Sequence, residues 1–226
     1  ISTYGNGVFS YDTQEERLSS YADLLPSPYA FTPFVDKSHN LWVALENMGV
    51  YVINFAQSEA RYLYYNGDRA GINHEDDVRL LKRVGNKIYI SNLQNGSKVA
   101  DVALKILQVF DGYHDDITAV AQDAKGKLFV GTRKKGIFDV DGGKNHVHSD
   151  DPASLGKGKV SDILFDRKNR MWVSLFDAGL EVYLNGKFIH VIESKSLQAR
   201  NMEMDKQGNI WLCTSQGALR FNPDEI

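Results

Sequence analysis

The residues best suited to chemistry stand in short polar segments between alternating apolar stretches. The segment "HVHSDD" at 146 to 151 carries His146 and His148, which share one face if the chain is extended, next to Asp150 and Asp151. Imidazole and carboxylate groups are common metal ligands. No third ligand stands at a spacing typical of a metal site, so we expect a surface strand end here, without a metal or other cofactor.

Two further acidic segments contain histidine. They are "NHEDD" at 73 to 77 and "YHDD" at 113 to 116, and each precedes an alternating apolar stretch. Runs of this kind are usually solvated loops. The functional alternative is that His74 and His114, with their neighbouring carboxylates, face a polar ligand.

No catalytic motif is present, and the composition excludes several other classes. There is no G-x-S-x-G, no H-E-x-x-H and no phosphate-binding glycine loop. The formal net charge of −3 gives no electrostatic case for nucleic-acid binding. No stretch approaches the roughly 18 apolar residues of a membrane span, and the first residues do not resemble a signal peptide. Cys213 has no disulfide partner, and we expect it to be a small buried hydrophobe in "IWLCT".

The polar segments are spaced by an internal repeat. Aromatic anchors follow one another at intervals of 47, 40, 43 and 39 residues: Trp42, Tyr89, Phe129, Trp172 and Trp211. A truncated copy precedes them, since "ISTYGNGVFSYD" aligns with "LCTSQGALRFNP". A repeat of about 42 residues is typical of β-propeller blades.

Each repeat reads as a series of strands. An alternating strand such as "VSDILFD" leads through a polar turn to an apolar strand such as "MWVSL", then to a third strand such as "GLEVY" and a less regular fourth. The segment "ADVALKILQVF" at 100 to 110 is the nearest to a helical pattern, and its place in the repeat favours strand.

The first turn of the repeat predicts one residue at positive φ. The turns are "DKSHN", "DAKGK", "DRKNR" and "DKQGN", and their fourth residues are types that tolerate positive φ: His39, Gly126, Asn169 and Gly208. The leading aspartate is expected to accept hydrogen bonds from the turn's own amides. In the Tyr89 repeat, "VGNK" suits a two-residue turn. A glycine starts each clear third strand and predicts positive φ or close backbone approach: Gly7, Gly49, Gly136, Gly179 and Gly217.

The second strand decides the architecture. "IWLCT" and "MWVSL" are apolar on both faces, so we expect both faces to be covered. Four-stranded antiparallel sheets covered on both sides by copies of themselves are propeller blades. A sandwich would alternate more cleanly and leave one face of each sheet in water. The predicted fold class is therefore all-β, a β-propeller.

At these residues the chain resembles the two-component regulator propeller repeat. The match is to D-x-x-G-x-I-W-x-x-T-x-x-G-L-x-x-F-N, seen in "DKQGNIWLCTSQGALRFN", and to the connecting "DDPASLG" at 150 to 156. The Tyr89 repeat departs from the pattern. The resemblance implies the extracytoplasmic sensor region of a hybrid two-component system, of the kind found in Bacteroidetes. It also implies a parent chain that is a membrane-anchored histidine kinase.

The phase of the repeat predicts a partial propeller. Both ends of the chain carry a third strand, so they do not complete one blade together. We expect whole blades at 29–72, 77–112, 116–155 and 159–195, and partial blades at 1–28 and 199–226. Unpaired edge strands invite self-association, as a homodimer or through sheet edges, and contact with other propeller segments of the same parent.

The loops between second and third strands are the predicted ligand-binding face. They differ in sequence while the strands around them agree, as specificity loops on a rigid scaffold do. Arg133 and Lys134 suit a carboxylate or sulfate, and Phe176 suits a sugar face. With the histidine segments, the candidate ligand-binding residues are Glu46, Asn47, His74, His114, Arg133, Lys134, Phe176, Asp177 and Gln216.

Three functions follow as hypotheses. The first is a periplasmic, non-enzymatic sensor segment that binds an oligosaccharide or other small polar ligand. The second is a propeller enzyme, a lyase or a glycoside-cleaving protein. The third is an interaction scaffold without a ligand. The first is favoured by the resemblance.

Overall fold

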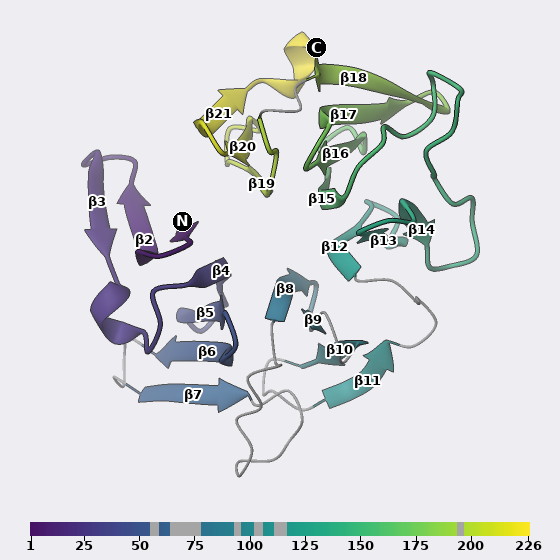
Figure 1. The fold of residues 1–226 in the computed structure, drawn as a ribbon. Helices are drawn as coiled ribbons and strands as arrows, with labels where there is room; N and C mark the ends of the chain where they lie inside the picture. The colour runs from purple at the N-terminus through teal and green to yellow at the C-terminus, as the bar shows by residue number, and fades with distance from the viewer. Residues whose placement is uncertain (55–58, 64–77, 93–95, 102–105, 111–116, 194–196) are drawn as a thin grey trace. The chain divides into compact units, whose positions relative to one another are not determined.

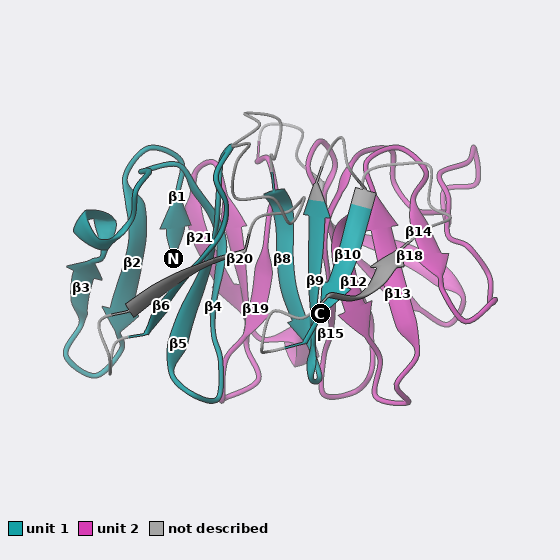
Figure 2. Ribbon diagram, turned by 90° about the horizontal axis from the view of Figure 1, so that it is seen from below, with its two compact units in different colours: residues 1–112 teal, residues 113–226 magenta. Residues whose placement is uncertain are grey.

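The computed structural model describes residues 1–54, 59–63, 78–92, 96–101, 106–110, 117–193 and 197–226. The chain forms two compact units, residues 1–112 (unit 1) and 113–226 (unit 2), shown in Figure 2. In each unit, the described residues form small antiparallel sheets and one short 3-10 helix (Figure 1). This confirms the expected all-β class.

Unit 1 contains three sheets, each formed by consecutive strands. The first holds β1 (Ser2–Thr3), β2 (Gly7–Asp12) and β3 (Arg17–Ser20), followed by the helix η1 (Ala22–Leu24). The second holds β4 (Ala30–Val35), β5 (Asn40–Leu45), β6 (Gly49–Asn54) and β7 (Glu59–Leu63). The third holds β8 (Val78–Val84), β9 (Lys87–Asn92), β10 (Gly96–Ala100) and β11 (Ile106–Phe110). Of "ADVALKILQVF", Ala100 thus ends β10 and Ile106–Phe110 form β11, so the described part of this segment contains strand and no helix.

Unit 2 also contains three sheets of consecutive strands. The first holds β12 (Ile117–Gln122), β13 (Leu128–Thr132) and β14 (Ile137–Asp139). The second holds β15 (Val160–Phe165), β16 (Met171–Leu175), β17 (Gly179–Leu184) and β18 (Lys187–Glu193). The third holds β19 (Met202–Met204), β20 (Ile210–Thr214) and β21 (Gly217–Phe221), and the helix η2 (Pro223–Glu225) follows it. In the β12–β14 sheet, described in full, a single bridge between Ile137 and His146 stands where the repeat predicts a fourth strand.

The turns between first and second strands follow one design. In the four "D-x-x-x-x" turns the aspartate amide donates to the carbonyl of the fifth residue, and the fourth residue has positive φ. The φ values are 62° at His39, 87° at Gly126, 61° at Asn169 and 94° at Gly208. The aspartate carboxylate also accepts from turn amides, as at Asp36 and Asp166. The predicted turn is confirmed at all four positions.

Each of these aspartates that precedes a tryptophan also binds it. The indole Nε1 of Trp42 donates to Asp36, that of Trp172 to Asp166 and that of Trp211 to Asp205, over 3.0, 2.9 and 3.0 Å. Together with the amide bonds, these donors outweigh the partial desolvation of Asp36 and Asp205 and hold the pKa of both carboxyl groups below its ordinary value. The bond locks the turn to the central strand of its sheet.

Apolar residues of successive sheets form the cores. In unit 2, Trp172 is fully buried among side chains of β17, β19 and β20, including Leu180, Met202 and Leu212. A second cluster joins β12–β14 to β15–β18 through residues such as Ala119, Ile163 and Val173. In unit 1, Trp42 packs with residues of β8 and β9. The middle sheet of each unit, β4–β7 in unit 1 and β15–β18 in unit 2, is therefore covered on both faces, as expected.

The last sheet departs from that expectation. Trp211 is 38% exposed and Cys213 is exposed, whereas Met202, Ile210 and Leu212 are buried. Two predictions were therefore wrong: β20 is covered on one face, and Cys213 is not a buried hydrophobe. The reason is that, within unit 2, the β15–β18 sheet covers the face with Leu212, and no described sheet covers the other.

Glycine at the start of the third strand is required most clearly at Gly136. Its φ is 75°, and a Cβ there would lie 2.2 Å from the carbonyl oxygen of His146. The positive φ predicted for this position also holds at Gly7, Gly49, Gly179 and Gly217.

Gly136→Ala is therefore expected to lower the free energy of unfolding by more than the roughly 1–2 kcal/mol that left-handed backbone costs an L-residue. Gly217→Ala is the matched control, because φ is 122° and nothing lies within 4 Å of its Cβ position. Urea unfolding followed by circular dichroism measures both. Equal losses would contradict a role for the His146 contact.

Candidate ligand-binding loops

The predicted site residues that the structure describes lie in connections between second and third strands. Glu46 and Asn47 join β5 to β6 in unit 1. In unit 2, Arg133 and Lys134 join β13 to β14, Phe176 and Asp177 join β16 to β17, and Gln216 joins β20 to β21. His74 and His114 lie outside the described residues.

In unit 1, the two candidate residues, Glu46 and Asn47, hold the β5–β6 loop in place. The hydroxyl of Tyr4 donates to both carboxylate oxygens of Glu46, over 2.8 and 2.9 Å. This hydrogen bond raises the pKa of the Tyr4 phenol. Asn47 has φ of 56° and closes the turn. Glu46 and Asn47 thus have structural roles, and their role in ligand binding stays a prediction.

In unit 2, the structure surrounds Phe176 with cations. The Lys159 ammonium lies 5.8 Å from the centre of the Phe176 ring, and the Arg200 guanidinium lies 5.3 Å from it. Both distances are typical of cation–π contacts. The Phe176 amide also donates to the Lys159 carbonyl over 3.0 Å, which fixes the β16–β17 loop beside the connection that enters β15.

Further cations stand in the β13–β14 loop, which lies at the same end of the strands as the β16–β17 loop. Arg133 is half-buried, while Lys134 and Lys135 are exposed, and the Lys135 amide donates to the hydroxyl of Thr132. Gln216 is exposed, and its amide donates to the hydroxyl of Thr214. The strand ends at these loops therefore carry cationic side chains on adjacent sheets, and two of these cations lie against the Phe176 ring. We call Phe176, Lys159, Arg200, Arg133 and Lys134 the cationic edge.

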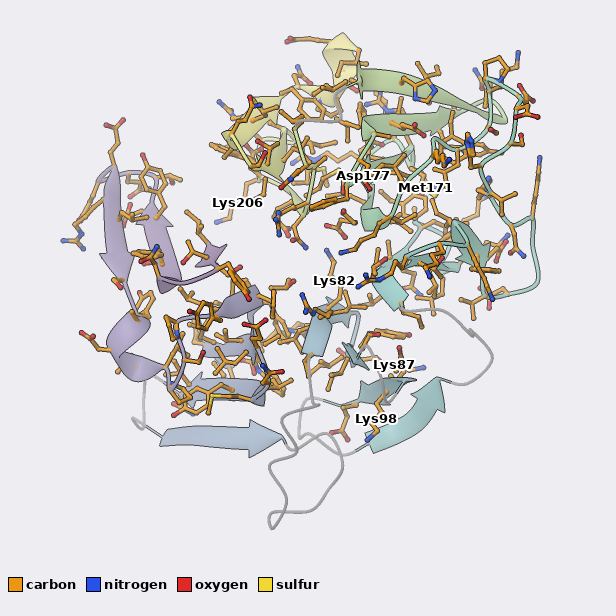
Figure 3. The ribbon with its side chains drawn as sticks, viewed as in Figure 1. Lys82, Lys87, Lys98, Met171, Asp177 and Lys206 are labelled. Carbon is orange, nitrogen blue, oxygen red and sulfur yellow. The ribbon has the colours of Figure 1, made fainter. Side chains whose placement is uncertain are left out.

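The next residue of the loop is Asp177, whose side chain is labelled in Figure 3, and it belongs to a different site. It lines a pocket of about 590 Å³ together with His190 of β18 and the connection at 148–157. Behind this pocket lies Glu181 of β17, which is fully buried. Its Oε1 lies 2.7 Å from Nδ1 of His190, and its Oε2 accepts from the Gly156 amide over 3.1 Å.

The two histidines of "HVH" have separate roles. His146 packs edge-on against Tyr183 and Phe188, with ring centres 4.6 and 5.4 Å away, and this burial lowers the pKa of its imidazole. His148 lines the pocket, and its Nδ1 lies 3.1 Å from the Leu155 carbonyl oxygen. Among the described residues, no group of three or more His, Cys, Asp or Glu is placed to hold a metal ion.

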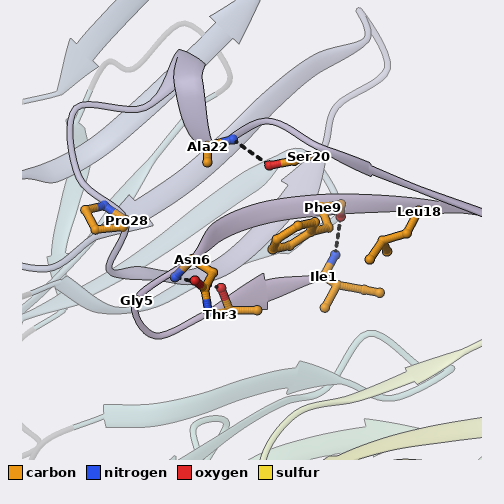
Figure 4. A pocket seen from close by; sticks show the side chains of 9 residues that line it. All are labelled: Ile1, Thr3, Gly5, Asn6, Phe9, Leu18, Ser20, Ala22 and Pro28. Atoms are coloured by element: carbon orange, nitrogen blue, oxygen red, sulfur yellow. Dashed lines mark hydrogen bonds between the residues drawn. The ribbon is translucent and has the colours of Figure 1, made fainter.

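Unit 1 has a hollow of a different kind, on the β1–β3 sheet (Figure 4). It measures about 620 Å³, and its lining includes Ile1, Phe9 and Leu18. The hydrogen bonds at its rim, such as that from the Ile1 ammonium to the Phe9 carbonyl over 2.8 Å, connect the strands to one another. None of the predicted site residues lines it.

Sequence reasoning missed Lys159, Arg200, Glu181 and His190. A signal existed for the first two: each stands one or two residues before a first strand, at the edge where the second-to-third-strand loops lie. Glu181 and His190 are directly paired across β17 and β18. The ladder shifts register between Leu180 and Glu181, so counting residues does not reveal that pair.

Comparisons with known proteins support the fold. No protein-family model matches the chain, and no curated protein matches it. Among solved structures, it is similar to the extracellular domain described as that of the hybrid two-component system BT3049 from B. thetaiotaomicron, with 17% identity over 99% of this chain and a TM-score of 0.51. It is similar to the extracellular domain of BT4673 from the same organism, with 14% identity over 96% of this chain and a TM-score of 0.58.

The chain spans 36% and 37% of those two proteins. It is also similar to the gluconolactonase XC5397 from Xanthomonas campestris, with 16% identity, a TM-score of 0.68, and coverage of 96% of this chain and 78% of that one. The chain therefore has a β-propeller fold. The predicted resemblance to the two-component propeller repeat is confirmed as a likeness of fold.

Proposed function

We propose that this chain is a ligand-sensing segment of the extracytoplasmic region of a two-component sensor, and that its cationic edge binds an anionic, carbohydrate-derived ligand. The likeness to the two Bacteroides extracellular domains supports the sensor role. The observation that carries the ligand class is the placement of Lys159 and Arg200 about the Phe176 ring. Guanidinium and ammonium groups form charge-assisted hydrogen bonds with carboxylate and sulfate groups.

The site suits an acidic sugar better than a neutral one. Arg133 and Lys134 on the neighbouring sheet extend the positive charge, and the Phe176 ring supplies an apolar surface between its two cations. A bound anion would be held by side chains from the β13–β14 loop and from the connections before β15 and β19. Ligand binding would then change how this segment is arranged against the partners that its loops contact. A ligand shifts such an equilibrium by its differential affinity for the two arrangements.

The sensor proposal places the chain in the periplasm, as part of a membrane-anchored parent with a histidine kinase elsewhere. None of the helices in the described part of the chain has the length and apolar character needed to cross a bilayer. Other propeller segments of the parent, or a second copy of this chain, are the protein partners we propose. The exposed side chains of Trp211 and Leu219 on the last sheet support contact with such a partner.

Calorimetric titration tests the ligand class. The chain is expected to bind oligosaccharides that carry sulfate or carboxylate groups and not their neutral counterparts, with an affinity that falls as salt rises. Arg200→Ala is expected to weaken this binding about tenfold, the effect of one charge-assisted hydrogen bond. The matched control is Lys206→Ala, which removes an exposed cation from the β19–β20 turn, at the opposite end of the strands from the second-to-third-strand loops.

Three outcomes would contradict the proposal. Equal affinity for acidic and neutral oligosaccharides would show that charge does not determine binding. Equal losses of affinity in Arg200→Ala and Lys206→Ala would show that the ligand does not bind at the cationic edge. Turnover of any oligosaccharide would favour the enzymatic alternative, a lyase or glycoside-cleaving propeller. Glu181 and His190, a carboxylate and an imidazole paired beside a pocket, are the groups to which that activity would first be assigned.

A further inference from the structure

The pocket beside Asp177 differs in chemistry from the cationic edge. Three carboxylates, Asp150, Asp151 and Asp177, line it with the two histidines, while Lys157 is the one ammonium in its lining. Asp151 already accepts from the Ala153 amide, which leaves Asp150 and Asp177 as its most available anions. The lining is therefore electronegative.

Both histidines of the lining lie against oxygen atoms of the protein. The carbonyl oxygen of Leu155 only accepts hydrogen bonds, so the contact at 3.1 Å places the proton of His148 on Nδ1. Oε1 of Glu181 lies 2.7 Å from Nδ1 of His190, and the charge of this buried carboxylate favours a proton on Nδ1. In the neutral form of each ring, Nε2 is then a hydrogen-bond acceptor.

Glu181 makes this arrangement rigid. Its side chain is fully buried, so it has a fixed place under the pocket, and the Gly156 amide binds its second oxygen. Gly156 belongs to the connection that forms the opposite wall. One buried carboxylate thus links β17, β18 and the 148–157 connection, and sets which edge of the His190 ring is presented.

We propose that this pocket binds a small organic ligand through a primary ammonium group. Asp177 is the counter-ion, and Nε2 of His148 and of His190 accept N–H bonds from the ligand. Glu181 is a positioning residue that acts through His190. An ammonium group has three donors and no acceptor, which matches a lining of carboxylates and imidazole acceptors. The proposal is independent of the acidic ligand at the cationic edge.

A neutral sugar fits this lining less well. The apolar lining residues are Pro152, Leu155 and Ala178, none of which offers an aromatic face for a pyranose ring. A metal ion also fits less well, because these carboxylates and imidazoles do not form a ligating group in the described residues. Hydrogen bonds from an ammonium group tolerate the spacing that metal coordination does not.

Titration with a matched pair of probes tests the proposal. Near neutral pH, cyclohexylamine carries an ammonium group, and cyclohexanol has the same ring with a neutral hydroxyl. We expect the chain to bind the amine at least about tenfold more tightly than the alcohol. Asp177→Asn, at an exposed residue, should weaken amine binding to a similar degree. Glu203→Gln, which removes an exposed carboxylate from β19, should leave it unchanged.

The positioning role of Glu181 has its own readout. Nitrogen NMR of the His190 ring should show the proton on Nδ1 in the native chain, and Glu181→Gln should change that signature and weaken amine binding together. Equal affinity for the amine and the alcohol, unchanged affinity in Asp177→Asn, or an Nδ1 without a proton in the native chain would each overturn the proposal. Because acidic oligosaccharides and Arg200→Ala are measured separately, failure here is distinct from failure of the cationic edge.

Discussion

Replacing Trp172 with alanine is expected to lower the free energy of unfolding by about 3–5 kcal/mol. The side chain is fully buried, and its ring lies 5.3 Å from that of Phe221. Removing it opens a cavity between two sheets and leaves Asp166 without its indole donor. Urea unfolding followed by far-ultraviolet circular dichroism measures the loss without relying on tryptophan emission.

The matched control is Trp211→Ala. Trp211 stands at the same place in its repeat and makes the same bond to its aspartate, but its side chain is 38% exposed. Since part of its surface is already in water, the loss should be about 1–2 kcal/mol, well below that at Trp172. Equal losses at the two positions would show that packing between sheets does not decide the stability of these anchors.

Replacing Asp166 with alanine is expected to cost about 3–5 kcal/mol, the range for breaking a buried charged pair. Its side chain is almost fully buried and accepts from the amides of Lys168 and Arg170, from Nε of Arg170 and from Nε1 of Trp172. The substitution leaves an indole donor and a mostly buried guanidinium without this acceptor. The same urea experiment measures it.

Asp123→Ala separates the turn from the buried network. Asp123 accepts from the amides of Lys125 and Lys127 in the same turn, but the anchor of its repeat is Phe129, whose side chain has no N–H to donate. We expect a loss of about 1 kcal/mol, that of a lost turn cap. A loss as large as that of Asp166→Ala would place the energy in the turn itself and contradict the importance of the indole bond.

The fold was predictable because its signals are local and repeated. The period of the aromatic anchors, the glycine before each third strand and the residue types at the fourth turn position each constrain a few neighbouring residues. The structure agrees at each described position. The exposed face of β20 was not predictable, because the burial of Trp211 depends on whether another sheet packs there, and "IWLCT" reads the same in both cases.

The site was less predictable, because its contacts join segments far apart in sequence. Phe176 was identified, but its partners Lys159 and Arg200 come from two different inter-sheet connections. The hydrogen bond from the Trp172 indole to Asp166 was not predicted, because the sequence suggested a turn role for the aspartate and a core role for the tryptophan. The link between them arises only when the turn brings the carboxylate back over the strand.

The bond between aspartate and indole stands at one end of the strands, and the loops that differ from sheet to sheet stand at the other. A strand of five or six residues separates them by roughly 17–20 Å. Under the proposed function, substitutions that change ligand recognition would therefore fall outside the network that secures the three sheets with this bond. Such an arrangement would let the loops change in sequence while the sheets keep their ability to fold.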